Sequence, residues 1–284
     1  MKELEPQAPP ARAAAAAKRT KYQHYVPRLH LKHFVGDRPK GMIWTYDMAT
    51  GKRRPSSIKE TGGENNFYSP VDEAGARFDG LDNLLTSIEG RAVEGYELLL
   101  QGCIPEGQTR ADFSTFVATL YTRSPRMLNG AATLFGRMAQ FALNMQWRNR
   151  EAFDRSLDAF EAEHGPIDIT RDELWEFHRD PDRYTLSVQR HRALPVIGAA
   201  DAIQQILFDR KWHVLPAFGG EFITSDSPVF KYTPRAENHP ILGDGGFSNP
   251  AAEITFPLSP KAMLLITNAQ LGRDLVATPD AIRF

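Results

Sequence analysis

Apolar residues recur at helical spacing through the middle of this 284-residue chain, and this pattern constrains the fold most strongly. Four stretches carry it: Leu81–Leu99, Phe113–Leu120, Met127–Met145 and Pro195–Phe208. Such spacing places the apolar side chains of each stretch on one face of a helix. The sequence therefore predicts a helical middle over residues 78–209.

Two local signals set helix boundaries inside this region. Pro125 lies between the second and third apolar stretches, where its ring and missing N–H are expected to break or kink a helix. Thr170 stands where an N-cap is needed for a short helix over Asp172–Arg179.

Strand patterns are found on both sides of the helical middle. Before it, Pro27 opens a short helix that ends at Gly36. The expected strands are Met42–Asp47, a second near Ser57–Lys59, then Trp212–Leu215, Glu221–Thr224, Ile254–Leu258 and Met263–Thr267, with a long loop over residues 231–250. We therefore predict an α+β fold in which the N-terminal and C-terminal β elements are candidates for one mixed sheet.

The organisation expected is a disordered tail over residues 1–20 and a single α+β domain over residues 21–284. The tail has almost no large apolar side chain whose burial would offset its ordering. The lone Cys103 excludes an intramolecular disulfide framework and a multi-cysteine zinc site. No apolar run reaches the ~18–20 residues that a membrane-spanning helix needs, so no membrane partner is predicted. We expect a cytoplasmic protein.

The formal net charge of -1 conceals an uneven distribution. Residues 18–54 hold ten basic and two acidic residues, a net charge of +8, whereas the first 17 residues sum to zero and the remainder carries -9. A basic segment of this kind is typical of a site for an anionic ligand. The alternative is that it neutralises the acidic helical part of the fold.

His24-Tyr25-Val26-Pro27, with Gln23 before it and Leu31 and Phe34 after it, resembles the opening signature of domain-of-unknown-function family 4238, which is mainly bacterial. His30 departs from the pattern, which usually has an aromatic residue there. Later blocks that resemble the family are Asn66-Phe67-Tyr68, Ile88-Glu89, Arg123 with Arg126, residues 222–229 and residues 256–260. The resemblance runs from Tyr22 to near the C-terminus, and it implies a shared fold and no established activity.

His24 is the first candidate for catalysis. It lies between Tyr22 and Tyr25 ahead of the rigid Pro27, and a histidine pKa near ~6.5 suits acid/base chemistry at neutral pH. The alternative is a structural histidine whose ring bonds a backbone carbonyl. His30 and His33 would complete a three-histidine metal site, but no nearby carboxylate is placed to orient them, so we assign no metal ligands.

Asp226 is the second catalytic candidate, since a carboxylate after a strand can orient a histidine or bind a metal. Its alternative role is to cap its own turn. Thr224-Ser225-Asp226 lacks the Gly-x-Ser-x-Gly pattern of a hydrolase nucleophile, which argues against Ser225 as a nucleophile. Ser225 is therefore kept only as a candidate for substrate binding.

Arginines and hydrogen-bonding groups complete the predicted substrate site. Arg123 and Arg126 flank Ser124-Pro125 and can fork onto phosphate or carboxylate, or Arg123 can instead form an internal salt bridge to Glu89. The other substrate-binding candidates are Arg28 in the basic segment, and Asn66 and Tyr68, which alternatively close a turn.

Two hypotheses of function follow, and the cofactor, the substrate and the oligomeric state stay unassigned. In the first, a hydrolase-like enzyme acts on an anionic, phosphate-bearing substrate such as nucleic acid, and His24, Arg123 and Asp226 converge on one pocket. In the second, a non-catalytic module binds nucleic acid or an acidic partner through its basic N-terminal segment. Tyr22, Trp44 and Tyr46 could then stack on bases, although aromatic residues on a hairpin more often belong to the core. No glycine-rich phosphate loop, dinucleotide fingerprint or His-Glu-x-x-His motif occurs.

Overall fold

The computed structural model describes residues 22–37, 39–69, 80–180, 183–234 and 243–269. Within them the chain has an α+β fold with a helical middle, as predicted from the sequence. The tail predicted over residues 1–20 lies outside the described residues. Within the described ranges, no helix combines the length and the apolar character needed to cross a bilayer.

The N-terminal part forms two small antiparallel sheets. Its elements are β1 (Tyr22–His24), α1 (Arg28–Leu31), the 3₁₀ helix η1 (Lys32–Phe34), β2 (Gly36–Asp37), β3 (Lys40–Tyr46), β4 (Arg53–Ser57) and β5 (Gly63–Asn65). β1 pairs with β5, and β2, β3 and β4 form the second sheet. The strand expected near Ser57–Lys59 begins earlier, because the Asp47 carboxylate accepts the N–H groups of Ala49 and Thr50 and closes a tight turn.

The helical middle consists of α2 (Gly80–Arg91), α3 (Val93–Leu100), α4 (Gly107–Thr122), α5 (Pro125–Gln146), α6 (Arg150–His164), α7 (Arg171–His178), the 3₁₀ helix η3 (Arg190–Ala199) and α8 (Ala200–Asp209). Ser124 caps α5 by accepting the Met127 N–H, and Pro125 occupies the first turn, where its missing N–H costs no hydrogen bond. Thr170 caps α7 in a reciprocal capping box with Glu173.

Two differences from the expected helices have local causes. The first apolar stretch forms two helices that meet at Ala92, so one apolar pattern continues across a backbone irregularity. Helix α6 was not predicted, since it buries only Phe153 and Leu157 and is otherwise rich in charge. A stripe this narrow gives a weak periodic signal.

The C-terminal sheet is antiparallel, with β6 (Lys211–Pro216), β9 (Ala262–Thr267), β8 (Glu253–Ser259) and β7 (Phe230–Tyr232) in spatial order. Residues 221–224 were expected to form a strand but are a connection, in which Phe222 donates its N–H to Pro260 O. The expected loop over 231–250 holds part of β7 and the 3₁₀ helix η5 (Gly246–Ser248) in its described portion. The mixed sheet is also not found among the described strands: N-terminal and C-terminal strands pair only within their own parts.

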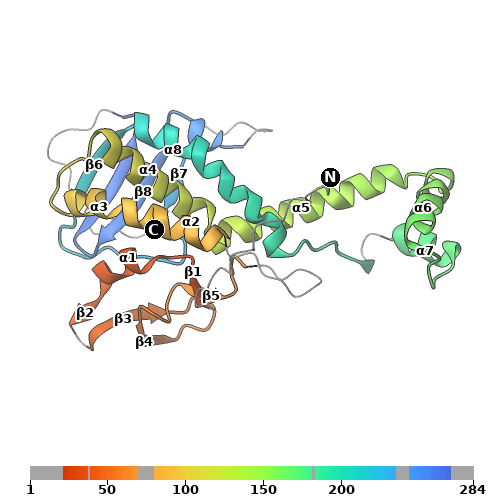
Figure 1. Ribbon diagram of the computed structural model, residues 1–284, viewed down its shortest axis with the longest axis horizontal. Helices are drawn as coiled ribbons and strands as arrows, with labels where there is room; N and C mark the ends of the chain where they lie inside the picture. Colours follow the sequence, from red (N-terminus) through yellow and green to blue (C-terminus); the bar gives the residue numbers. More distant parts are fainter. Residues whose placement is uncertain (1–21, 38, 70–79, 181–182, 235–242, 270–284) are drawn as a thin grey trace, which may run out of the picture.

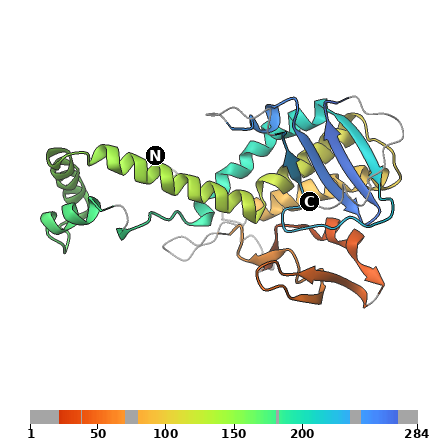
Figure 2. The same ribbon diagram turned by 180° about the vertical axis from the view of Figure 1, so that it is seen from behind.

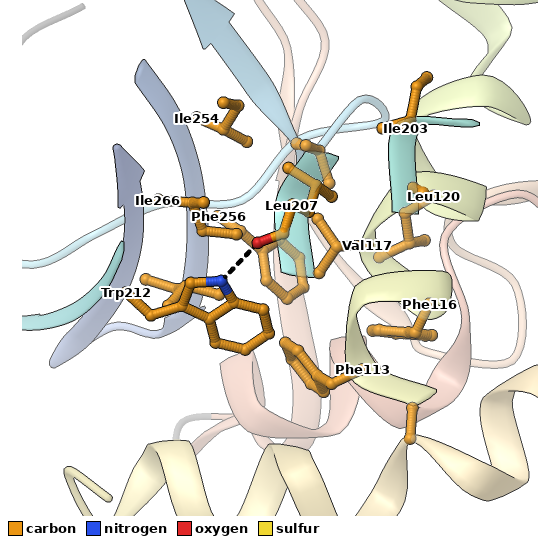
Figure 3. Packing of buried hydrophobic residues seen from close by; sticks show 14 of the residues in the cluster. Phe113, Phe116, Val117, Leu120, Ile203, Leu207, Trp212, Ile254, Phe256 and Ile266 are labelled. Carbon is orange, nitrogen blue, oxygen red and sulfur yellow. Dashed lines mark hydrogen bonds between the residues drawn. The ribbon is translucent and has the colours of Figure 1, made fainter. Parts of the chain in front are cut away.

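The main core lies between this sheet and helices α4 and α8 (Figure 3). Phe113 and Phe116 from α4 meet Phe256 from β8, and the Trp212 indole N–H donates to Leu207 O at 2.8 Å. Burying each such large apolar side chain contributes about 1.5–3 kcal/mol. This core fixes the sheet against the helices and so positions the connections at their ends.

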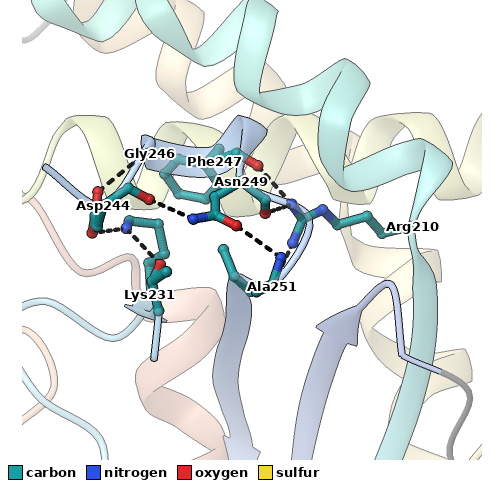
Figure 4. Close-up of polar contacts among 9 residues, drawn as sticks. Arg210, Lys231, Asp244, Gly246, Phe247, Asn249 and Ala251 are labelled. Atoms are coloured by element: carbon teal, nitrogen blue, oxygen red, sulfur yellow. Dashed lines mark hydrogen bonds and ion pairs between the residues drawn. The ribbon is translucent and has the colours of Figure 1, made fainter. Parts of the chain in front are cut away.

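Arg210, at the end of α8, ties the loop before β8 to the body (Figure 4). Its buried guanidinium donates to Phe247 O at 2.6 Å and Asn249 O at 2.7 Å, and also to Ala252 O. Burial lowers the pKa of Arg210. The arginine therefore satisfies three carbonyls that the loop leaves without strand partners.

The molecule has a body and a projecting arm (Figures 1 and 2). α5 leaves the body between α4 and η3 and carries α6 and α7 at its far end. The N-terminal sheets lie against the body on the side of α1. We call residues 125–149 the stem of the arm and residues 150–180 its tip.

Candidate functional site

The signature segment, residues 22–34, begins with β1 and places His24 at the strand end. The half-buried His24 ring packs edge-on against Tyr22, and its Nε2 lies 3.1 Å from Ile58 O. A carbonyl only accepts, so Nε2 carries the proton and Nδ1 is left as an acceptor. The carbonyl contact matches the structural alternative for this histidine, and the same contact fixes the tautomer that a general base needs.

Charged neighbours tune His24. Burial is the largest effect and lowers the pKa of His24 below its usual value, while the contact with Ile58 O raises it. The charges of Arg28 and Arg123 lower this pKa further, and Glu89 raises it. His24 is therefore neutral at pH 7, and two of the predicted arginines act on it electrostatically.

Arg123 is a buried ion-pair partner. Its side chain is 1% exposed at the end of α4, and its Nη2 donates to Glu89 Oε1 at 2.9 Å. This is the internal salt bridge that the sequence offered as the alternative to ligand binding. Its Nε has no hydrogen-bond partner in the described part of the chain. Arg123 thus acts on His24 through its charge from a buried position.

Tyr68 lies next to this pair, and Asn66 precedes it by two residues in a turn. Tyr68 is buried, its hydroxyl lies 3.5 Å from Arg123 O, and burial raises the pKa of its phenol. Gln23 accepts the Tyr68 N–H at 2.7 Å and donates to Ser69 Oγ at 2.7 Å. Asn66 has a φ of 57°, the left-handed conformation that asparagine tolerates in turns.

Gln23 was not predicted as a site residue. Its contacts join two sequence blocks more than 40 positions apart, with separations of 45 and 46. The signal available was its place directly before His24 in the family-like signature.

His30 joins the signature segment to the segment over residues 222–229. Tyr96 donates its hydroxyl proton to Leu258 O at 2.9 Å, so it accepts from His30 Nδ1 at 2.8 Å. His30 Nε2 then accepts from the Thr224 hydroxyl at 2.7 Å. Burial lowers the pKa of His30 to about 3.

The histidines do not gather around a metal position. His33 stacks on Tyr96 with ring centroids 4.6 Å apart, and burial lowers its pKa to about 4. Both nitrogens of His30 are already used, and no group of three potential metal ligands occurs among the described residues.

Asp226 and Ser225 are exposed in the connection between β6 and β7. Ser225 Oγ accepts the Ser227 N–H at 3.1 Å, so Ser225 and not Asp226 caps this turn. Burial raises the pKa of Tyr25 to about 12, and the charge of Asp226 contributes to the increase. The charge of Asp226 therefore acts on Tyr25 of the signature segment.

Arg126 lines a different hollow from Arg123. A cavity of about 130 Å³ lies between the start of α5 and β7, and the exposed Arg126 borders it with Ser124, Ser227 and Lys231. Lys231 is paired with Asp244, and Ser227 Oγ is buried without a partner in the described part. Cationic and hydroxyl groups around a small cavity suit an anion.

A larger cavity of about 570 Å³ lies between α5 and residues 184–190, and none of the predicted site residues lines it. Arg28, Glu89 and Arg123 thus all act on the His24 pKa through their charges. Asp226 acts in the same way on Tyr25, and Arg126 borders a separate cavity.

The aromatic residues of β3 are not core. Trp44 is 57% exposed and Tyr46 is 63% exposed, and alternate residues of a strand share one face. Tyr46 lies opposite the exposed Arg53 of β4. Trp44 and Tyr46 point outward because the buried side of this small sheet is taken by Ile43 and Ser56.

Comparison with known proteins gives one match. A family model described as "Protein of unknown function (DUF4238)" matches residues 22–280. The comparisons with curated proteins and with solved structures find no match.

Proposed function

Because the chain belongs to the DUF4238 family, whose description assigns no activity, we propose a function from its own residues: an enzyme that acts on an anionic, phosphate-bearing substrate, with His24 as proton acceptor. One observation carries this proposal. The contact with Ile58 O holds the His24 ring so that the unprotonated Nδ1 remains, in a histidine whose pKa is lowered.

Each nearby group has a role in phosphodiester hydrolysis, the version of the proposal that we favour. Nδ1 of His24 takes a proton from water as its oxygen attacks phosphorus, and the leaving oxygen departs with the electrons of the broken P–O bond. Arg28, exposed beside His24, binds the phosphate oxygens. Asp226 orients the substrate from the exposed connection between β6 and β7. Arg126 and Ser124 hold a further anionic group in the smaller cavity.

The test is hydrolysis of bis(p-nitrophenyl) phosphate and of a short single-stranded oligonucleotide by the full chain. His24→Gln keeps a donor near the Nε2 position for Ile58 O and removes the basic Nδ1. We expect the rate to fall about 10²–10⁴-fold without loss of folding. The control is His164→Gln at the tip of the arm, which should keep full activity. Full activity of the His24 variant would refute the base assignment.

A second candidate is the non-catalytic nucleic-acid module, and the exposure of Trp44 and Tyr46 favours it. Aromatic side chains on a basic surface stack on single-stranded bases, at about 1–3 kcal/mol per base. Trp44→Ala with Tyr46→Ala should then weaken oligonucleotide binding, and the binding should fall steeply with salt. Phe218→Ala, which removes a side chain 68% exposed, is the control. Binding without turnover would select this candidate over the enzyme.

A further inference from the structure

The stem of the arm presents an apolar stripe to solvent. Leu134, Met138, Phe141 and Met145 on α5 are between 54% and 67% exposed. Their spacings of four, three and four residues are those of a heptad seam, which in other helices packs against a second helix. Helical stability normally comes from packing of such a face, so this stripe marks a surface that lacks a packing partner within the described part of the chain.

The tip carries the complementary charge. Residues 125–149 hold three arginines and no acidic residue, a net charge of +3, whereas residues 150–180 hold four arginines and ten acidic residues, a net charge of -6. Each arginine of the tip is paired within the tip, as Arg171 is with Asp158 and Glu161. Arg137 and Arg148 of the stem form no ion pair with another described residue.

The tip also exposes apolar side chains. Phe160, Ile169 and Phe177 are between 37% and 47% exposed. Taking about 200 Å² for a large side chain, the seven side chains of stem and tip offer roughly 700 Å². A standard interface buries about 800 Å² on each partner, so the arm alone nearly supplies one.

We propose that the arm docks on the arm of a second copy of this chain, the stem of each against the tip of the other. Two-fold symmetry produces both contacts at once, because the same two surfaces exist on every copy. The basic stem then meets the acidic tip twice, and both apolar sets are removed from water. This inference does not depend on the proposed function.

An anionic lipid surface is the competing occupant. A helix with arginines and an apolar face is typical of peripheral membrane binding. The acidic tip at the end of the same arm opposes it, since a net charge of -6 is repelled by anionic headgroups. A second copy matches the charge and the apolar side chains of both stem and tip, whereas an anionic membrane matches only those of the stem.

The test is the molar mass of the full chain by light scattering and sedimentation across a concentration series. We expect a dimer at micromolar concentration. Met138→Glu with Phe141→Glu should raise the dissociation constant at least about 100-fold, because it places two carboxylates in each of the two apolar contacts of the dimer. Phe218→Glu is the matched control, since Phe218 is 68% exposed but lies in the body of the molecule. Circular dichroism checks that the variants keep their helices.

A second pair of measurements tests the charges. Arg137→Glu with Arg148→Glu should weaken the dimer about tenfold at low salt and less at high salt. A monomer at every concentration, or a dimer that survives the Met138→Glu and Phe141→Glu changes, would overturn the proposal. Sedimentation of the wild-type chain with phosphatidylserine vesicles, lost in the same double variant, would assign the stripe to a membrane instead.

Discussion

The Nε2 atom of His30 lies 2.7 Å from the Thr224 hydroxyl oxygen and joins residues 194 positions apart in the sequence. The bond fastens α1 to the segment that carries Ser225 and Asp226. Through Tyr96 it also reaches Leu258 O on β8. Three distant parts of the chain are therefore held together by one neutral imidazole.

This arrangement predicts an acid-sensitive fold. His30 stays neutral when folded, with a pKa of about 3, but takes up a proton near pH ~6.5 when unfolded. Between these values the unfolded state binds one more proton, so stability falls as the pH is lowered, by at most about 1.4 kcal/mol per pH unit from this group. Urea unfolding from pH 7 to pH 4 measures the slope. His30→Gln should be less stable at pH 7 and should show a shallower slope, and an unchanged slope would contradict the assignment.

Removing the partner of Arg123 should be costly. Glu89→Ala leaves a buried guanidinium without its carboxylate, and we expect a loss of about 3 kcal/mol in the free energy of unfolding. Glu89→Gln keeps an oxygen acceptor and should lose less. Chemical denaturation of the two variants compares them: equal losses would show that the retained oxygen acceptor contributes nothing, and no loss in either variant would contradict a stabilising ion pair.

The His24 pKa should respond with opposite signs to two substitutions. Arg28→Ala removes a charge that lowers the pKa and should raise it, whereas Glu89→Gln removes a charge that raises the pKa and should lower it. Titration of the His24 ring by NMR measures both. Shifts in the same direction would mean that these side chains do not act on His24 through their charges.

Gly136 should tolerate no side chain. A Cβ there would lie 2.5 Å from Leu186 O, which is backbone and cannot rotate away. Gly136→Ala should cost about 1–3 kcal/mol and loosen residues 184–190 from α5. Gly130, on the same helix, has no atom within 4 Å of its Cβ position, so Gly130→Ala should stabilise by about 0.5–1 kcal/mol. Thermal unfolding of both variants, with hydrogen exchange over 184–190, tests the pair.

Arg210→Lys should destabilise the loop before β8. A lysine ammonium cannot reproduce the planar fork that reaches Phe247 O, Asn249 O and Ala252 O together. Loss of one charge-assisted bond costs about 1.5–3 kcal/mol. Hydrogen exchange over residues 243–252 should rise more than in the sheet. Unchanged protection would show that the loop holds without the arginine.

The positions of the predicted site residues in the structure depend on contacts that their place in the sequence does not reveal. Arg123 and Arg126 look equivalent in sequence, on either side of Ser124-Pro125, yet one is buried against Glu89 and the other borders a cavity. Arg123 ends α4 and Arg126 begins α5, so the two side chains point in different directions. Their spacing in the sequence does not predict this difference. Trp44 and Tyr46 were expected to be core more often than surface, but the sheet that carries them has only one buried face.

The sequence by itself determined the helical middle, the start of α5 at Pro125 and the Thr170 cap. It also carried the family resemblance, which the family match over residues 22–280 confirms. The helices and caps depend on residues within a few positions of one another, and the family resemblance depends on motifs that can be read directly from the sequence. Only the tertiary structure decided that His30 would bond Thr224, that the β elements would form separate sheets, and that α5 would leave the body as an arm. Such outcomes depend on contacts between distant segments, whose energies no local window of the sequence contains.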